Sequence, residues 1–461
     1  MKTVPPDPLE GIGIAEFGLR LRRGEITAEG AAGRYLDRIA ALDSRLRAFV
    51  HVAGDQALDA ARGIDRLLAA RVDLGPLMGV PVAVKDLFTV DGMPPPKVGS
   101  NLDVSDLVEP EGSFIGRLKR AGCVILGKTR MTEFAFGLVN LIHAPAWNPW
   151  DAQVHRMPGG SSSGSAVALA AGMCAFSVGS DTGGSVRQPA ALCGVFGLKT
   201  TVGLWQTDGV FPLSTTLDSI GTFTASAHDT ALVFAVLAGQ PIPETRPVKG
   251  LRLGKPRNHY FEGLGPEVQR RTDDALQTLQ SAGVELVTIE VPEAAEIDTV
   301  FAPILPNELL AHLGAERVSG GKGTIDPLVL SRLEPAFKYA AIDYIRARNR
   351  QRALCRIAED RMRGLDGWVT PTTLDTAVPV ADWATLERAA AWTRRSTNNT
   401  RPGNLFGQCG ASIPVPTPRG ALPVGLQVMC APGREQSLLS ISLAIEGAIG
   451  RPARADLAGF M

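Results

Sequence analysis

Residues 158–199 read PGGSSSGSAVALAAGMCAFSVGSDTGGSVRQPAALCGVFGLK and contain two segments rich in glycine and serine. The first is GGSSSGS and the second is GSDTGGS; between them lie a small-residue segment, predicted to be a helix over 165–171, and a short apolar run. Glycine is favoured where backbone amides approach a ligand or adopt positive φ. A globular core does not require so much glycine and serine together, so we expect both segments to face one cleft.

The second segment offers a hydroxyl group beside a glycine turn. Gly183 and Gly184 precede Ser185, and such glycines allow several backbone N–H groups to point at one position next to the serine hydroxyl. Donors arranged in this way form an oxyanion hole. A serine is a weak nucleophile on its own, so a base has to activate it.

Lys85 is the strongest candidate for this base. It ends the run GVPVAVK, in which Val80–Val84 is predicted to be a buried strand. A lysine that emerges from a buried strand loses hydration, which lowers its pKa and favours the neutral amine. The alternative, a strand-end lysine that reaches solvent, stays open on these residues alone. Histidine is the more usual base, but none of the six lies in a glycine-framed or apolar-strand setting: His51, His143, His155, His228, His259 and His312.

Taken together, Lys85, GGSSSGS and GSDTGGSVR resemble the amidase signature family. The resemblance implies that Ser185 is the nucleophile, Ser161 a bridging serine and Lys85 the base, and that the Gly160–Ser161 peptide bond is cis. The separation of the two serines, 185 − 161 = 24 residues, fits the family's pattern. The family's oxyanion hole maps onto four consecutive backbone N–H groups, those of Thr182, Gly183, Gly184 and Ser185.

The resemblance extends over most of the chain. Asp181 and Arg187 also match the family's motif, and we interpret them as a charge pair that holds the turn. Four further segments fit the family: LGPLMGVPVAVKDLF at 74–88, AGCVILGKTRMTEFAFG at 121–137, WNPWD at 147–151 and GLQVMCAPGREQSLL at 425–439.

The family's fold is α/β, with a large mixed central β-sheet flanked by helices on both faces. The resemblance implies a single catalytic domain over residues 1–461. Within it we expect an N-terminal helical segment at about 9–70, the signature core at about 75–220 and a variable, substrate-side region at about 295–350.

The hydrophobic pattern independently favours an α/β fold. Helical periodicity predicts helices over 14–23 and 28–42, with Thr27 as the N-cap of the second, and a further helix over 266–282. Strands that alternate with helices indicate a sheet covered on both faces. Buried strands are predicted for eight apolar runs: 80–84, 123–126, 174–178, 251–254, 284–291, 367–371, 413–415 and 424–429.

The loop that follows the Lys128 segment is expected to border the substrate pocket. An apolar lining would indicate an uncharged, largely apolar acyl or aryl group. One interpretation makes Trp147 part of a lid over an aryl group, and ordinary packing of these side chains is the alternative. Arg130 stands where many members of the family have asparagine, which leaves the identity of the substrate open. The candidate pocket residues are Phe134, Phe136, Leu138 and Trp147.

Three other motifs match known patterns but lack the expected context. GCVILGKT at 122–129 fits a phosphate-binding loop, yet its centre is strand-like and no strand precedes it. GSSSG at 160–164 fits a nucleophile elbow around Ser162, but the residues before it do not form a buried strand. Ser319 and Lys322 have the spacing of penicillin-binding enzymes, but two glycines between them oppose the required helix. We therefore favour none of these three.

Composition excludes several classes of protein. Lysine plus arginine and aspartate plus glutamate number 47 each, so we expect no nucleic-acid partner. The start, MKTVPPDPLEG, lacks an apolar signal core and no stretch is long enough to span a membrane, which predicts a cytoplasmic protein without membrane contact. The six cysteines are scattered in apolar settings, and no clustered cysteine or histidine indicates a metal site.

These observations predict a serine hydrolase that cleaves amide-type C–N bonds through an acyl-enzyme and needs no cofactor. The chain most resembles bacterial amidases of aryl amides and carbamates, including urethane-hydrolysing members, so a small-molecule amide or carbamate is the expected substrate. The alternative is the catalytic (glutaminase) subunit of a glutamine-dependent tRNA amidotransferase, which works with partner subunits. An inactive binding relative is the third hypothesis. If the protein self-associates, the expected assembly is a homodimer.

Overall fold

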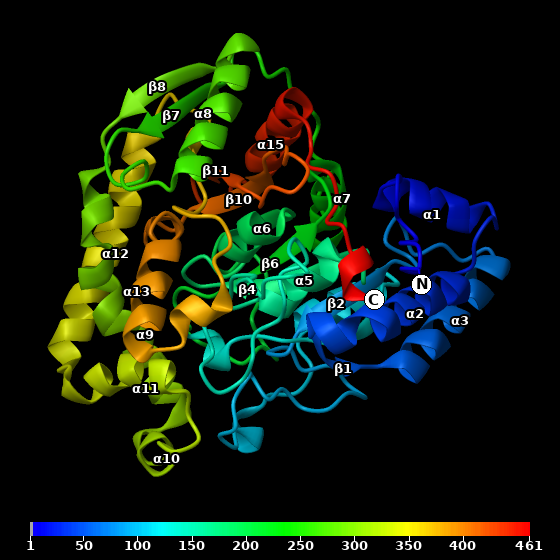
Figure 1. The fold of residues 1–461 in the computed structure, drawn as a ribbon, viewed down its shortest axis with the longest axis horizontal. Helices are drawn as coiled ribbons and strands as arrows, with labels where there is room; N and C mark the ends of the chain where they lie inside the picture. The colour runs from blue at the N-terminus through cyan, green and yellow to red at the C-terminus, as the bar shows by residue number, and fades with distance from the viewer. Residues whose placement is uncertain (1–2) are drawn as a thin grey trace.

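The computed structural model describes residues 3–461 (Figure 1). Its strands join into one mixed sheet in the order β1-β3-β2-β4-β6-β5-β10-β11-β9-β7-β8. The strands are β1 Phe49–Val52, β2 Pro81–Lys85, β3 Val124–Thr129, β4 Phe176–Asp181, β5 Phe196–Lys199, β6 Ser219–Thr224, β7 Arg252–Pro256, β8 Glu285–Ile289, β9 Gly367–Pro371, β10 Cys409–Pro414 and β11 Gly425–Cys430.

Helices cover this sheet and extend beyond its edges (Figure 1). They are α1 Ile14–Arg22, α2 Ala28–Leu46, α3 Gly54–Ala69, α4 Ser113–Arg120, α5 Ser163–Ala170, α6 Arg187–Cys193, α7 Ala227–Ala238, α8 Pro266–Ser281, α9 Ile297–Leu313, α10 Ala315–Gly320, α11 Pro327–Leu333, α12 Ala341–Arg361, α13 Leu386–Ser396, α14 Arg401–Leu405 and α15 Glu435–Ile449.

The predicted sheet with helices on both faces is confirmed. α5 packs against α6 and these helices contact β4, β5 and β10, whereas α7 packs against α15 and these contact β5, β6 and β10. Two helix layers that share strands in this way lie on opposite faces. Strands with both faces covered should be apolar throughout, and β2, β3 and β4 are buried along their whole length.

The sheet brings the two motif segments together. β2 pairs in parallel with β4, in the register Val82 with Phe176 and Val84 with Val178. Parallel neighbours end at the same edge, so Lys85 at the end of β2 lies beside the last residues of β4. The glycine turn that carries Ser185 follows β4 directly, so it starts at the same edge.

Most predicted elements are present with shifts of a few residues at their ends. Gly367–Pro371 is a strand with the predicted bounds, and Thr27 caps α2 by accepting a hydrogen bond from the Gly30 N–H at 3.0 Å. The pattern missed β1, β5 and β6, which carry glycine or polar residues among their apolar ones. The single domain over 1–461 stays a prediction; the structure shows strands from residue 49 to residue 430 in one sheet.

The three rejected motifs have other structural roles. β3 runs through the phosphate-loop match, and its Lys128 forms a buried ion pair with Asp86 at 2.8 Å. Ser162 is fully buried and its hydroxyl donates to the Ser180 carbonyl at 3.3 Å, so it is not an exposed nucleophile. Ser319 lies near the end of α10, which stops before Lys322. None of these segments offers the geometry that its motif needs.

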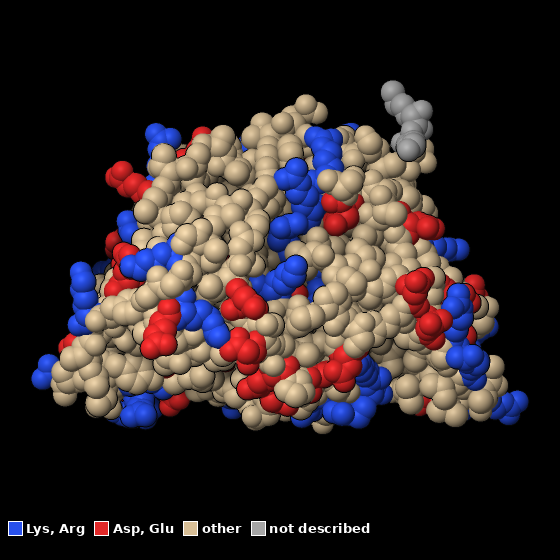
Figure 2. All heavy atoms as spheres, turned by 90° about the horizontal axis from the view of Figure 1, so that it is seen from below, with Lys and Arg blue, Asp and Glu red and all other residues tan. Residues whose placement is uncertain are grey.

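The surface carries both signs of charge. On the face seen in Figure 2, basic and acidic side chains lie close together, as expected for equal numbers of each. Within residues 3–461, no helix combines the length and the apolar character that a membrane crossing requires.

Candidate active site

Lys85 ends β2 and reaches the first serine segment. Its Nζ lies 2.7 Å from Ser161 Oγ and 2.9 Å from Ser180 Oγ, and its side chain is fully buried. Sequence reasoning missed Ser180. The available signal was its place within GSDTGGS, at the end of the strand that pairs with β2.

Burial changes the protonation of this lysine. It lowers the pKa of Lys85 from 10.5 to about 7, although the charges of Asp218 and Asp181 act in the opposite direction. With a pKa near 7, about half of the molecules hold a neutral amine at neutral pH. A neutral amine can accept the proton of the Ser161 hydroxyl that it touches.

Ser161 is held by the backbone around it. The Gly160–Ser161 peptide bond is cis. The Gly160 N–H donates to Gln188 Oε1 at 3.0 Å, and the Ser161 carbonyl accepts from the Thr132 N–H at 3.2 Å. These contacts tie the segment to α6 and to the chain after β3, so the Ser161 hydroxyl has a fixed position next to Lys85.

Ser185 lies on the turn between β4 and α6, and a buried carboxylate organises this turn. Asp181 accepts hydrogen bonds from the Gly184 N–H at 2.8 Å and from Arg187 Nη2 at 2.9 Å. Burial alone would raise the pKa of Asp181, but the charge and hydrogen bonds of Arg187 hold it well below its usual range. The predicted charge pair that holds the turn is therefore present.

The prediction that Gly184 is an oxyanion donor is wrong, because its N–H is used by Asp181. The N–H groups of Thr182, Gly183 and Ser185 have no acceptor within residues 3–461, and these three residues line one cavity. Gly184 has another role: its φ is +120°, and a Cβ there would lie 2.0 Å from Thr400 Oγ1. The turn therefore leaves three amides, not four, free for an oxyanion.

Asp218 is a second residue that sequence reasoning missed. It accepts the Thr182 hydroxyl at 2.5 Å and the N–H groups of Leu213 and Ser214 at 2.9 and 3.0 Å. Burial raises the pKa of Asp218 to about 6. Asp218 thus holds Thr182, at the start of the turn between β4 and α6, and places a carboxylate near Lys85. No motif or spacing in the sequence singles it out.

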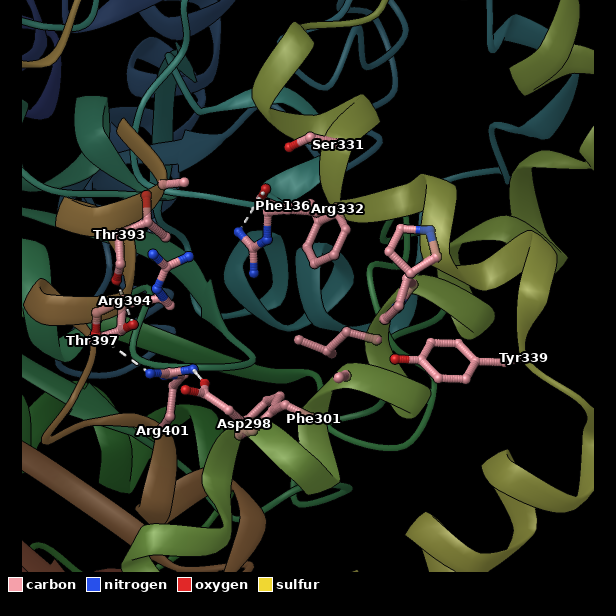
Figure 3. Close-up of a pocket in the computed structure, with 15 residues that line it drawn as sticks. Phe136, Asp298, Phe301, Ser331, Arg332, Tyr339, Thr393, Arg394, Thr397 and Arg401 are labelled. Atoms are coloured by element: carbon pink, nitrogen blue, oxygen red, sulfur yellow. Dashed lines mark hydrogen bonds and ion pairs between the residues drawn. The ribbon is translucent and has the colours of Figure 1, made fainter. Parts of the chain in front are cut away.

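A cavity lies next to Ser185 and adjoins a larger one. Phe136 and Leu138 line the inner cavity together with Ser185, and their contact with substrate stays a prediction. The outer cavity, of about 300 Å³, shares Phe136, Phe301 and Arg332 with it (Figure 3). Phe301 on α9 and Arg332 on α11 come from the region predicted to lie on the substrate side.

Two other pocket predictions are wrong. Phe134 is buried, and its ring stacks on Phe211 at 6.0 Å, away from both cavities. Trp147 stacks on His155 at 4.3 Å and meets the Phe460 ring edge-on at 6.2 Å. Its indole N–H donates to the Asp151 carbonyl at 2.6 Å. Trp147 anchors a turn against the C-terminal segment and lines neither cavity.

The outer cavity is largely apolar, and the expectation of an uncharged substrate stays a prediction. The outer cavity has an apolar wall that includes Phe301, but it also contains three guanidinium groups. They belong to Arg332, Arg394 and Arg401 and lie on one side of the cavity, opposite Tyr339 (Figure 3). The loop that follows the Lys128 segment could not reveal this positive charge, because the arginines come from α11, α13 and α14.

The comparison with family models matches residues 31–439 to the amidase family. The chain is 37% identical to a 2-amino-5-chloromuconic acid deaminase from Comamonas testosteroni over 451 residues, which cover 95% of this chain and 96% of the relative. It is 32% identical to a glutamyl-tRNA(Gln) amidotransferase subunit from Geobacter metallireducens over 478 residues, with coverage of 94% and 96%.

Solved structures agree with these matches. A crystal structure of an amidase superimposes with a TM-score of 0.86 at 28% identity, covering 95% of this chain and all of that one. The peptide amidase from Stenotrophomonas maltophilia gives a TM-score of 0.82 at 27% identity, covering 98% of this chain and 100% of the other. With the family model, the relatives and the shared fold in agreement, the chain belongs to the amidase signature family of enzymes, which hydrolyse amide C–N bonds.

Proposed function

We propose that this chain hydrolyses small amides through Ser185, Ser161 and Lys85. Ser185 Oγ forms a bond to the substrate carbonyl carbon while its proton passes to Ser161, whose own proton passes to the neutral amine of Lys85. The oxyanion accepts hydrogen bonds from the free N–H groups of Thr182, Gly183 and Ser185. When the C–N bond breaks, Lys85 returns the proton through Ser161 to the leaving amine.

The acyl-enzyme is then hydrolysed by the same groups in the same order. Water attacks the ester carbon and gives a proton to Lys85 through Ser161, and the Ser185–acyl bond breaks as Ser185 takes that proton back. The observation that carries the proposal is the 2.7 Å contact between Lys85 Nζ and Ser161 Oγ, with burial lowering the lysine pKa to about 7. A lysine with its ordinary pKa would be a cation at neutral pH and could not accept the proton.

The relatives and the sequence suggest four substrate classes. The name of one relative describes the removal of an amino group from an acid, and another relative is a peptide amidase. The sequence pattern adds aryl amides and aryl carbamates. The experiment is a panel of anilides, aliphatic amides, esters and aryl carbamates, assayed with the purified chain and with S185A. Hydrolysis of at least one amide by the wild type and none by S185A supports the proposal, and equal turnover by both proteins contradicts it.

A glutaminase subunit of a tRNA amidotransferase is the second candidate. Several glutamyl-tRNA(Gln) amidotransferase subunits are 32–34% identical to the chain over 93–96% of its length. Such a protein depends on partner subunits, whereas an independent amidase does not. Release of ammonia from glutamine, with no activity on the amide panel, would favour this candidate. Turnover of anilides by the chain alone would favour the independent amidase.

A further inference from the structure

Arg332 is a cation without a carboxylate partner inside the cavity. Its Nη1 donates to the Phe136 carbonyl at 3.0 Å, and its guanidinium carbon lies 4.1 Å from the centre of the Phe136 ring. None of the ion pairs formed within residues 3–461 includes it. Burial lowers the pKa of Arg332 to about 10, which still leaves it charged at neutral pH. Its remaining N–H groups are free to bind a ligand.

The neighbouring groups add to the positive charge. Arg401 is paired with Asp298, but its Nε is buried and has no hydrogen-bond partner. Arg394 completes a set of three guanidinium groups in a cavity whose lining contains one carboxylate, that of Asp298 (Figure 3). Arg332 and Arg401 are partly buried and Arg394 is exposed, and three guanidinium groups beside one carboxylate leave a net positive charge at the cavity. The cavity is therefore suited to an anion.

Arg332 also connects this cationic side to the reacting serine. It lines both the outer cavity and the inner one that holds Ser185. Guanidinium groups bind carboxylates through two parallel hydrogen bonds, a geometry that lysine cannot reproduce. The lining also includes Phe301 and Leu305, whose apolar side chains can contact a short hydrocarbon spacer. We infer that the substrate is an acidic amide, with a carboxylate on Arg332 while Ser185 attacks its amide carbonyl.

This inference rests on the proposed function and is tested with matched substrates. The charged probes are the p-nitroanilides formed with one carboxyl group of succinate, glutarate and adipate. The uncharged probes are the p-nitroanilides of the corresponding alkanoic acids, which have a methyl group in place of the free carboxylate. The variants are R332M and R332K, and R352M is the control because Arg352 is exposed on α12, outside both cavities.

The wild type should prefer at least one charged probe. For R332M, kcat/KM for a charged probe divided by kcat/KM for its uncharged counterpart should fall by about 10- to 100-fold, because the hydrogen bonds between the guanidinium group and the carboxylate are lost. R332K should recover part of that ratio, and R352M should leave it unchanged. Equal ratios in wild type and R332M, or a wild-type preference for the uncharged probes, would overturn the inference.

A binding measurement keeps the test independent of folding and of turnover. Calorimetry with succinate, glutarate and adipate on S185A should show binding of at least one diacid, and S185A/R332M should lose it while keeping the melting temperature of S185A. If none of the diacids binds S185A, the acidic-substrate inference is wrong even where amide hydrolysis is intact. If S185A hydrolyses the anilides as fast as wild type, the proposed function fails instead.

Discussion

Proton acceptance by Lys85 predicts a specific pH dependence. Burial moves the lysine pKa from 10.5 to about 7. This corresponds to about 5 kcal/mol in the free energy of protonating the amine, at roughly 1.36 kcal/mol per pH unit. Because only the neutral amine accepts a proton, kcat/KM should be near its plateau at pH 8. It should fall tenfold per pH unit below about 7, to about 1% of the plateau at pH 5.

The assay is kcat/KM for one uncharged anilide between pH 5 and 10, in buffers of constant ionic strength. D218N supplies the companion profile. The Asp218 carboxylate raises the pKa of Lys85, so its neutralisation should lower that pKa and shift the acid limb to lower pH. Asp218 also holds the Thr182 hydroxyl, so the plateau is expected to fall while the limb moves.

Three results would refute this reasoning. A profile that stays flat down to pH 5 would mean that no group with a pKa near 7 controls the reaction. An acid limb near pH 10 would mean that Lys85 keeps its ordinary pKa in the folded protein. A limb near 7 that D218N shifts upward would contradict the assigned sign of the Asp218 effect.

Three further predictions concern stability and the pocket. An unfolded lysine has a pKa of about 10.4, above the folded value of about 7 for Lys85, so the unfolded chain binds more protons between these pH values. As the pH rises through this range, the unfolding free energy of the wild type should increase relative to that of K85M by about 1.4 kcal/mol per pH unit. Parallel curves of unfolding free energy against pH, measured by chemical denaturation, would disprove this. G184A should lose about 2–4 kcal/mol of unfolding free energy, because the position has a positive φ and a Cβ there overlaps Thr400. G183A should keep its melting temperature, because a Cβ there has no neighbour nearer than 3.5 Å. Equal losses in the two variants would contradict this difference in available space. W147A should lose about 2–4 kcal/mol in stability and leave the KM ratio of large to small amides unchanged, and a rise confined to large amides would restore the lid.

The sequence predicted what lies in contiguous motifs. Lys85, Ser161 and Ser185 came from two glycine-rich segments and one apolar run, and the α/β fold came from the alternation of strands and helices. Because β2 and β4 are parallel neighbours, these local motifs meet at one edge of the sheet. The strands β5 and β6 were missed because glycine and polar residues weaken their apolar pattern.

What the sequence could not show depends on orientation and on distant contacts. The direction of the Gly184 N–H depends on its φ of +120° and on the Asp181 carboxylate that accepts from it. Trp147 packs against Phe460, far along the chain, so its loop alone suggested a pocket residue. Arg332 belongs to a helix with no recognisable motif, and only the folded chain places it beside Ser185.

The most direct test is to identify the serine that becomes covalently modified. The wild type is incubated with a fluorophosphonate and the labelled peptide is located by mass spectrometry, with S162A as a control because Ser162 is buried beside the site. We predict a single adduct on Ser185 in both proteins, no adduct in S185A, and labelling in wild type that slows below pH 7. An adduct on Ser162, or labelling of S185A at the wild-type rate, would contradict the assignment of Ser185 as the nucleophile.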